Sequence, residues 1–328
     1  MRDAAVIDEI VEIEAADGVT RRGILTLPGG GAPAAVLLLM QAGLRYRVGP
    51  ARLYVDLARQ LAAEGFATLR LDPAGMGESD GSLEAGHVHD LWRTIEGGRF
   101  VGDAMLAIQH ARERLPGARI YLGGLCGGAV TLTLATALAS DAVSGLIAIN
   151  AAVAWSPGRH RPPAPGALEA RANLGAYSRK MLSPEAWRRV VTGATDYRAI
   201  AATLTSFFSG QAAPGPGINR LYLSALREVR RRGIPQLFLF SENDSRWFQF
   251  QELVLAQELR GSLVGPSHVI RLIPDANHEL HWRAWRRTAC DWIRHWMAET
   301  PGVRPPAALP PGSSAPRGSR EAARRSPP

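Results

Sequence analysis

Cysteine is nearly absent from the sequence, which has only Cys126 and Cys290 among 328 residues. Two cysteines cannot form the disulfide framework of a small secreted domain. Without histidine clusters they are also too few for a structural zinc site. We therefore expect no metal and no cofactor. Cys290 lies in a segment rich in tryptophan and arginine near the C-terminus and is expected to be a bystander.

Long apolar runs and lysine are also scarce. No run of eighteen apolar residues occurs, so no membrane span is expected. The first residues, Met1 to Ala4, lead into an acidic segment without an apolar signal region, and we expect a cytoplasmic location. Lys180 is the only lysine, which we interpret as a trait of genomic composition.

The formal net charge is +8, and its distribution argues against a nucleic-acid partner. Residues 301–328 hold five arginines and one glutamate, which account for half of the excess. No basic stripe interleaved with aromatic residues occurs in the rest of the chain. The arginine cluster at 227–232 is typical of the solvated end of a helix, where cations also suit the helix dipole.

Apolar runs alternate with segments of helical pattern along most of the chain. An N-terminal hairpin is predicted first, because a turn signal at 15–18 separates two strand-like runs. Strands are predicted over 5–14, 20–27, 34–40, 67–71, 120–122, 143–150, 236–240 and 268–273. Helices are predicted over 52–64, 98–115, 129–135, 246–259 and 281–299. The alternation predicts an α/β fold with a mostly parallel central sheet flanked by helices.

The alternation stops after Ala152. From Trp155 to about Gly233 the chain is helical in pattern, aromatic and rich in proline, with helices predicted over 177–191 and 218–231. We interpret the chain as a core in two parts with a helical cap inserted between them and a disordered tail rich in proline and arginine. The predicted boundaries are 1–152 and 234–300 for the core, 153–233 for the cap and 301–328 for the tail.

Aromatic side chains recur in the predicted cap. They either line an apolar acyl pocket or pack the interior of the cap, and the sequence does not choose between these roles. They are Trp155, Tyr177, Trp187, Tyr197, Phe207 and Phe208.

A glycine-rich stretch centred on Cys126 joins a predicted strand to a predicted helix. The sequence Gly124-Leu-Cys-Gly-Gly128 has the pattern of a nucleophile elbow, in which a strained turn presents one nucleophile and small flanking residues let the turn close. Glycine-rich turns of this kind also bind phosphates. This one lacks the Lys-Ser/Thr ending of a P-loop and the spacing of a dinucleotide-binding turn. A small, buried cysteine without chemistry is the remaining alternative.

A thiol nucleophile needs a base, and the base needs an orienting acid. In the order nucleophile, acid, histidine, Asp244 follows the strand predicted at 236–240, and His278 follows the strand predicted at 268–273. We therefore predict a triad of Cys126, Asp244 and His278.

Several other residues compete for these roles. Glu242 is an alternative acid, although it lies closer to the strand end. Asp275 is close to His278 in sequence and is a second possible partner for it. His281 is predicted at the start of the last helix with a structural role, and His87 and His89 are predicted in a loop.

An oxyanion hole needs two backbone N–H groups. The residue after the nucleophile, Gly127, is expected to supply one of them. The other is expected from the loop after the strand at 34–40, where Gly43 or Ala42 is the candidate. The sequence does not decide between these two.

Four segments together resemble the α/β-hydrolase superfamily, and more narrowly the exosortase-A-system-associated and serine-aminopeptidase-like hydrolases. They are residues 43–52, 69–79, 124–128 and 182–189. The resemblance covers about residues 35–300 and implies the α/β-hydrolase fold with a helical cap. Two departures are Gln41-Ala42, where many relatives have His-Gly, and Pro73-Ala74, where an arginine before the glycine is common.

These features predict an acyl hydrolase, an esterase, thioesterase or lactonase, that acts on a small-molecule acyl ester or thioester through a covalent thioester on Cys126. Dienelactone hydrolases and polyester synthases resemble this elbow, each with cysteine at its centre. Two alternatives remain, namely an acyltransferase with the same triad and a non-catalytic binding protein on a hydrolase scaffold. The sequence does not give the acyl group, the leaving group or the oligomeric state.

Overall fold

An eight-stranded sheet runs through the protein in the computed structural model, which describes residues 6–40, 43–83, 87–155, 217–255 and 267–300. The strand order is β1-β2-β4-β3-β5-β6-β7-β8. The strands are β1 (Val6–Glu14), β2 (Thr20–Pro28), β3 (Ala35–Leu39), β4 (Ala67–Leu71), β5 (Arg119–Leu125), β6 (Gly145–Ile149), β7 (Gln236–Ser241) and β8 (His268–Ile273).

Six of the strands are parallel and two are not. The N-terminal hairpin β1–β2 joins the sheet through an antiparallel pairing of β2 with β4. From β4 to β8 every neighbouring pair is parallel. Strands β3 to β7 are buried at every residue except Arg119, the first residue of β5, as expected for parallel strands that helices cover on both faces.

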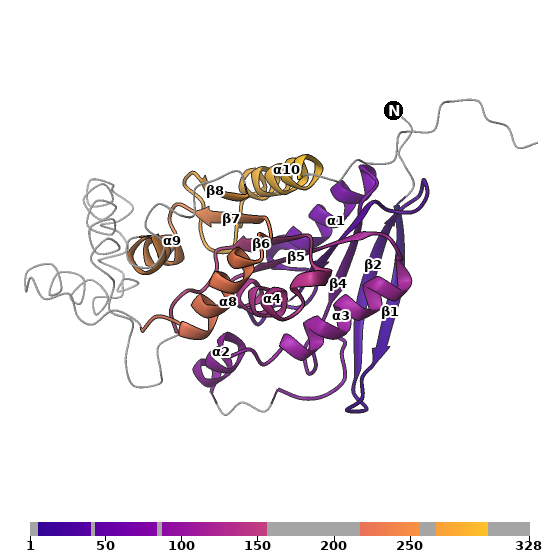
Figure 1. The fold of residues 1–328 in the computed structure, drawn as a ribbon, viewed down its shortest axis with the longest axis horizontal. Helices are drawn as coiled ribbons and strands as arrows, with labels where there is room; N and C mark the ends of the chain where they lie inside the picture. The colour runs from indigo at the N-terminus through magenta and orange to yellow at the C-terminus, as the bar shows by residue number, and fades with distance from the viewer. Residues whose placement is uncertain (1–5, 41–42, 84–86, 156–216, 256–266, 301–328) are drawn as a thin grey trace, which may run out of the picture.

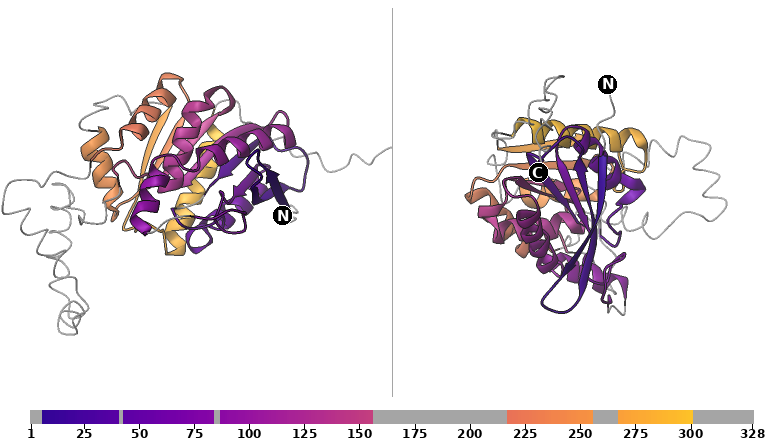
Figure 2. Two further views of the ribbon diagram at one scale, coloured as in Figure 1. Left: turned by 90° about the horizontal axis from the view of Figure 1, so that it is seen from below. Right: turned by 90° about the vertical axis from the view of Figure 1, so that its right-hand side faces the viewer.

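Helices cover both faces of the sheet. Helices α1 and α10 lie on one face, and α2, α3, α4 and α8 lie on the other (Figures 1 and 2). The helices are α1 (Leu53–Ala63), α2 (Val88–Glu96), α3 (Val101–Arg114), α4 (Gly127–Leu138), α8 (Arg220–Arg231), α9 (Ser245–Phe250) and α10 (Arg283–Glu299). Short helical turns occur at Pro50–Arg52, Ser140–Ala142 and Gln251–Leu255.

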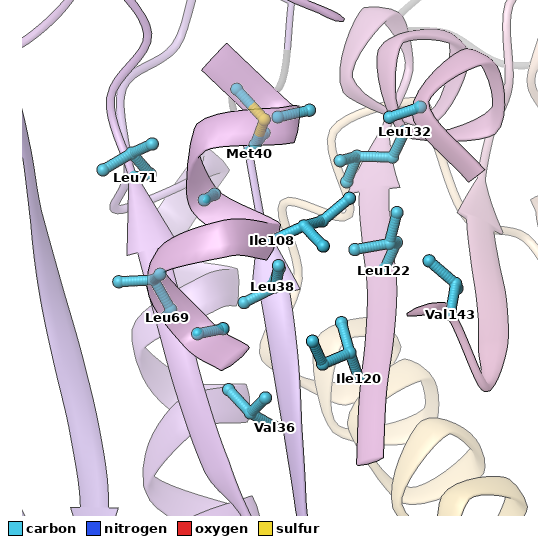
Figure 3. Close-up of a cluster of buried hydrophobic side chains, with 14 of the residues drawn as sticks. Val36, Leu38, Met40, Leu69, Leu71, Ile108, Ile120, Leu122, Leu132 and Val143 are labelled. Atoms are coloured by element: carbon cyan, nitrogen blue, oxygen red, sulfur yellow. The ribbon is translucent and has the colours of Figure 1, made fainter. Parts of the chain in front are cut away.

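Apolar side chains from the sheet and from α3 and α4 form a continuous core (Figure 3). Ile108 of α3 lies over Leu38 and Leu122, which project from neighbouring strands. Each of these side chains is almost fully buried, and burial of one such side chain is worth about 1.5–3 kcal/mol. This packing fixes the carboxyl ends of β3, β5 and β6, where the candidate site lies.

The N-terminal hairpin is tied to the core by charge. Arg21 of β2 donates from Nε to Asp103 of α3 at 2.6 Å, and both side chains are nearly inaccessible to solvent. On the outer strand, in contrast, Ile10 is 80% exposed. The hairpin is therefore anchored through β2, whereas β1 forms an open edge of the sheet.

The predicted alternation of strands and helices is confirmed, with two local differences. His87 and His89 were predicted in a loop, whereas residues 88–96 form helix α2, because Leu91 and Ile95 stand one turn apart and are both buried. The helix predicted over 246–259 is α9 followed by a π-helical turn at Gln251–Leu255. The helix predicted over 177–191 and the tail 301–328 lie outside the described residues, so the boundaries proposed for cap and tail remain predictions.

Within the described part of the chain, none of the helices is long and apolar enough to cross a membrane.

Candidate active site

Cys126 occupies a sharp turn between β5 and α4. Its backbone angles, φ 57° and ψ −118°, lie in a region that non-glycine residues rarely adopt. Its N–H donates to the carbonyl of Ile149 at 2.9 Å, which holds the turn against β6. A Cβ on Gly124 would lie only 2.6 Å from the carbonyl carbon of Gly128, so strand and helix approach this closely only with glycine. This is the geometry of a nucleophile elbow.

Tyr54 supports the elbow from the opposite face of the sheet. The N–H of Leu125, the residue before Cys126, donates to the Tyr54 hydroxyl at 2.8 Å. Strand β3 ends at Leu39, opposite Gly123, so it offers Leu125 no ladder partner. The buried hydroxyl of α1 satisfies this N–H, and burial raises the pKa of Tyr54 above its ordinary value.

His278 and Asp244 meet at the carboxyl end of the sheet. Nδ1 of His278 lies 2.6 Å from Oδ2 of Asp244, whose side chain is only 4% exposed. The other carboxylate oxygen of Asp244 accepts the backbone N–H of Arg246 at 3.1 Å, as the cap of α9. Asp244 is therefore fixed by its own helix and orients the ring of His278.

The His278 ring and the Cys126 thiol line the same cleft, and the two groups shift each other's pKa. Burial disfavours the thiolate, but the neighbouring His278 ring and the charge of Arg246 lower the pKa of Cys126 below the usual thiol value. Burial likewise disfavours the imidazolium, but the hydrogen bond to Asp244 and the proximity of Cys126 raise the pKa of His278 to about 10. Both shifts favour a thiolate–imidazolium pair.

Asn150, a residue that the sequence analysis did not single out, holds the loops of this site together. It follows β6 with φ 44° and is fully buried. Its side-chain amide donates to Oγ of Ser241 at 2.9 Å and to the carbonyl of His278 at 3.0 Å. Its Oδ1 accepts the N–H of Ser241 at 2.8 Å. Asn150 thus ties the end of β7 to the loop that carries His278.

The two glycines predicted for the oxyanion hole lie against each other. A Cβ on Gly127, the first residue of α4, would lie 3.5 Å from Cα and 3.9 Å from N of Gly43. Gly43 has φ 63°, and a Cβ there would overlap the Trp92 ring at 2.3 Å. Gly43 therefore excludes a larger side chain beside Cys126. The alternative donor, Ala42, lies outside the described residues.

The competing residues have other partners. Glu242 accepts the N–H of Asp275 at 2.9 Å, and Asp275 accepts an N–H from Asn243 through its carbonyl. His281, predicted at the helix start, stands two residues before α10 and interacts with Glu279 at 3.5 Å. His87 caps α2 through Nδ1, which accepts the N–H of residue 89.

Comparison with known proteins supports the architecture. The family described as serine aminopeptidase, S33, matches residues 48–201. A hypothetical protein from Pseudomonas aeruginosa superposes with a TM-score of 0.54 at 17% identity, over 90% of this chain and 94% of that one. The dienelactone hydrolase from Anabaena variabilis gives a TM-score of 0.53 at 15% identity, over 90% and 98%. Est1E from Butyrivibrio proteoclasticus, solved with ferulic acid, gives a TM-score of 0.52 at 15% identity, over 88% of this chain and 98% of that one.

The chain has the α/β-hydrolase fold. No curated protein sequence matches it. At these identities the solved structures establish the fold alone, and the chemistry must be argued from the side chains.

The α/β-hydrolase fold carries ligand-binding residues at the carboxyl ends of its parallel strands, and a cleft of about 630 Å³ opens there. Cys126 and His278 face this cleft. The remaining lining residues are Leu44, Arg45, Tyr46, Pro50, His89, Trp92, Leu125, Arg246 and Glu279. The cleft therefore combines an apolar wall with charged side chains close to the thiol.

Two parts of this cleft were not anticipated from the sequence. His89 and Trp92 come from α2, a helix that was not predicted. Arg246 was noted only as the start of a helix.

No group of three or more His, Cys, Asp or Glu side chains suited to a metal ion occurs among the described residues.

Proposed function

We propose that the protein is an acyl hydrolase that cleaves esters or thioesters through a Cys126–His278–Asp244 triad. The observation that carries this proposal is the position of the His278 ring, whose Nδ1 lies 2.6 Å from the Asp244 carboxylate and which lines the same cleft as the Cys126 thiol. Cys126 and His278 line a cleft large enough for a small acyl substrate.

In the first half-reaction, the Cys126 thiolate attacks the substrate carbonyl carbon. The carbonyl oxygen takes the electron pair as an oxyanion, which the N–H groups of Gly127 and the Gly43 segment stabilise. The imidazolium of His278 then gives its proton to the leaving oxygen or sulfur as the bond to the acyl carbon breaks. The products of this step are a thioester on Cys126 and a free alcohol or thiol.

In the second half-reaction, neutral His278 takes a proton from water as the water oxygen attacks the thioester. The tetrahedral intermediate collapses, the acid leaves, and Cys126 departs as a thiolate. Asp244 stabilises the imidazolium that re-forms, without taking its proton. The thiolate–imidazolium pair is thereby restored without any net change in oxidation state.

Mass spectrometry of the intact protein tests this mechanism. After brief incubation with p-nitrophenyl esters of graded acyl length, the wild type should gain the mass of one acyl group and release nitrophenol. Cys126→Ala should gain none. Cys290→Ala is the matched control and should acylate normally, because Cys290 is fully buried and its pKa is raised to about 12.

The outcomes separate three functions. Discharge of the adduct by water identifies a hydrolase, and discharge only by an added alcohol or amine identifies an acyltransferase. Absence of both adduct and nitrophenol with every ester and thioester would contradict the proposal and favour a non-catalytic binding protein.

A further inference from the structure

Arg246 stands out among the charges of the cleft. It lies two residues after Asp244, in the first turn of α9, and lines the same cleft as Cys126 and His278. Its Nη1 donates to Oε1 of Gln249 at 3.2 Å, a neutral acceptor on the same helix. Within the described ranges no carboxylate forms an ion pair with it. The positive charge of Arg246 therefore faces the cleft without an ion pair to any carboxylate in the described ranges.

The other charges that line the cleft have partners. Arg45 donates to Glu279 at 2.7 Å, and this hydrogen bond lowers the pKa of Glu279. The His278 imidazolium faces the Asp244 carboxylate and the Cys126 thiol. Of the two arginines that line the cleft, Arg45 is therefore paired with a carboxylate, whereas no described carboxylate forms an ion pair with Arg246.

The electrostatic reach of Arg246 extends to the reacting atom, because its charge is among those that lower the pKa of Cys126. A group on the substrate that meets this guanidinium would therefore lie near the scissile carbonyl. Guanidinium groups bind carboxylates and phosphates through two parallel N–H donors, so arginine suits anions that present two oxygens side by side. The rest of the wall, including Trp92, Leu125 and Leu44, suits a hydrocarbon segment.

We propose that the substrate is an anionic ester or thioester, with a carboxylate or similar anion that binds Arg246 and a hydrocarbon segment that lies on the apolar wall. This proposal rests on the proposed hydrolase function. The anion can belong to the acyl part or to the leaving group. In both arrangements an anion of the substrate binds the Arg246 guanidinium. The experiment below distinguishes an anion on the acyl part from one on the leaving group.

Two isosteric substrate pairs test the proposal. Mono-p-nitrophenyl adipate and p-nitrophenyl 6-methylheptanoate place a carboxylate or an isopropyl group at the end of the acyl chain, far enough from the ester to avoid attack by that carboxylate. The hexanoates of 3-hydroxybenzoic acid and of 3-isopropylphenol make the same comparison on the leaving group. We expect kcat/KM to be about tenfold higher for the anionic member of at least one pair, as for one charge-assisted hydrogen bond. The responding pair identifies the part of the substrate that bears the anion.

Three variants assign the preference to one side chain. Arg246→Gln should bring the anionic-to-neutral ratio of kcat/KM close to one, whereas Arg246→Lys should retain part of it. The ratio cancels any change in Cys126 reactivity, because both substrates of a pair meet the same thiol. Arg231→Gln is the charge-matched control, since Arg231 is exposed on α8 and paired with Glu228. It should leave the ratio unchanged.

A ratio of one for both pairs in the wild type would overturn the anionic-substrate proposal and leave the hydrolase function standing. Survival of the preference in Arg246→Gln would also overturn it. If the wild type turns over no ester, the hydrolase function fails, and calorimetry of the four esters with Cys126→Ala tests the anion site alone. Equal Kd values for the two esters of each pair would then overturn the anionic-substrate proposal. Tighter binding of an anionic ester would support the proposal if this advantage is lost in the double variant Cys126→Ala/Arg246→Gln.

Discussion

At the scale of single residues, the resting ionisation of Cys126 and His278 is the main chemical feature of the site. In the proposed mechanism the thiol must be deprotonated to attack, and its pKa is lowered below the usual thiol value, so reactivity should rise as pH passes this lowered pKa. The imidazolium must be protonated to release the leaving group, and its pKa is about 10, so activity should fall as pH passes that value. The pH profile of kcat/KM should therefore be a plateau between these limits.

Alkylation by iodoacetamide measures the acid limb directly. Cys126 should be alkylated at neutral pH, and His278→Ala should move the onset of alkylation to higher pH. Cys290 provides an internal control, because burial raises its pKa to about 12 and it should stay unmodified in the folded protein. Equal alkylation of the two cysteines at neutral pH would contradict the thiolate–imidazolium assignment.

Asp244 can be tested apart from the nucleophile. Asp244→Asn removes the negative charge beside His278, so kcat should fall by about 10²–10⁴-fold, and the basic limb should move to lower pH. Asp275→Asn is the matched control, because Asp275 is close to His278 in sequence but contacts Glu242 instead. Steady-state kinetics across pH distinguish the two. Loss of activity in the control with retention in Asp244→Asn would reverse the assignment of the acid.

Residue types in a fixed order allowed Cys126, Asp244 and His278 to be proposed from the sequence, because each follows a buried apolar run. Asn150 and Arg246 could not be found in this way. The role of Asn150 depends on contacts to two segments about 90 and 130 positions further along the chain, which no local pattern encodes. Arg246 is one arginine among many, and only the arrangement of the cleft distinguishes it.

At the scale of elements, the crossing of β5 and α4 explains the glycines of the elbow. Gly124→Ala would place a Cβ 2.6 Å from the carbonyl carbon of Gly128 and 2.8 Å from N of Ala129, so strand and helix would have to separate. We expect this change to cost several kcal/mol of stability, as large distortions of a packed core do, and to abolish acylation. Chemical denaturation and adduct formation measure the two effects.

Gly102→Ala provides the matched control for that change. Gly102 lies within α3, and a Cβ there meets nothing within 4 Å. The substitution should leave acylation unchanged and stabilise the protein by up to about 1 kcal/mol, the difference between the helix propensities of the two residues. A similar loss of acylation in both variants would contradict the steric explanation.

The strands were predictable because parallel strands covered on both faces are uninterrupted apolar runs. Helix α2 was not predictable, because it is short and follows a glycine turn that reads as a loop. Only two of its apolar residues are buried, Leu91 and Ile95, and its remaining side chains are largely polar. The π-helical turn after α9 has no sequence signature that distinguishes it from a continued α-helix.

At the scale of the whole molecule, the buried Arg21–Asp103 pair joins the antiparallel hairpin to the parallel part of the sheet. Burial raises the pKa of Asp103 despite its hydrogen bond with Arg21, so desolvation is a large part of the energetics of this pair. Asp103→Leu would leave Arg21 buried with only Asp17, and should destabilise the protein by about 3 kcal/mol. Denaturant titration measures this loss.

Two further variants identify the cause. The double variant Arg21→Met/Asp103→Leu should recover much of the loss, because neither charge then needs to be desolvated. The exposed pair between Arg114 and Glu9 links the same hairpin to the same helix, and Glu9→Gln should cost less than about 1 kcal/mol. A loss of similar size for both pairs would show that burial is not the determining factor.

The layered α/β architecture followed from the alternation of patterns, but the strand order did not. Strand β3 lies between β4 and β5, which is a property of packing and crossover geometry rather than of any segment. The resemblance to α/β-hydrolases implied the fold class, and no strand order was predicted from it. The narrower resemblance to exosortase-associated hydrolases, and the proposed cap, remain predictions.

The strained backbone angles of Cys126 imply a trade-off between stability and activity. A residue with a side chain at φ 57° and ψ −118° costs about 1–3 kcal/mol, and the surrounding packing must supply that free energy. Glycine would adopt the same angles without this cost. The residue with the least backbone strain at this position is therefore one that has no reactive side chain. Selection for stability alone would remove the thiol, and its presence in so strained a turn is itself an argument that the turn is used.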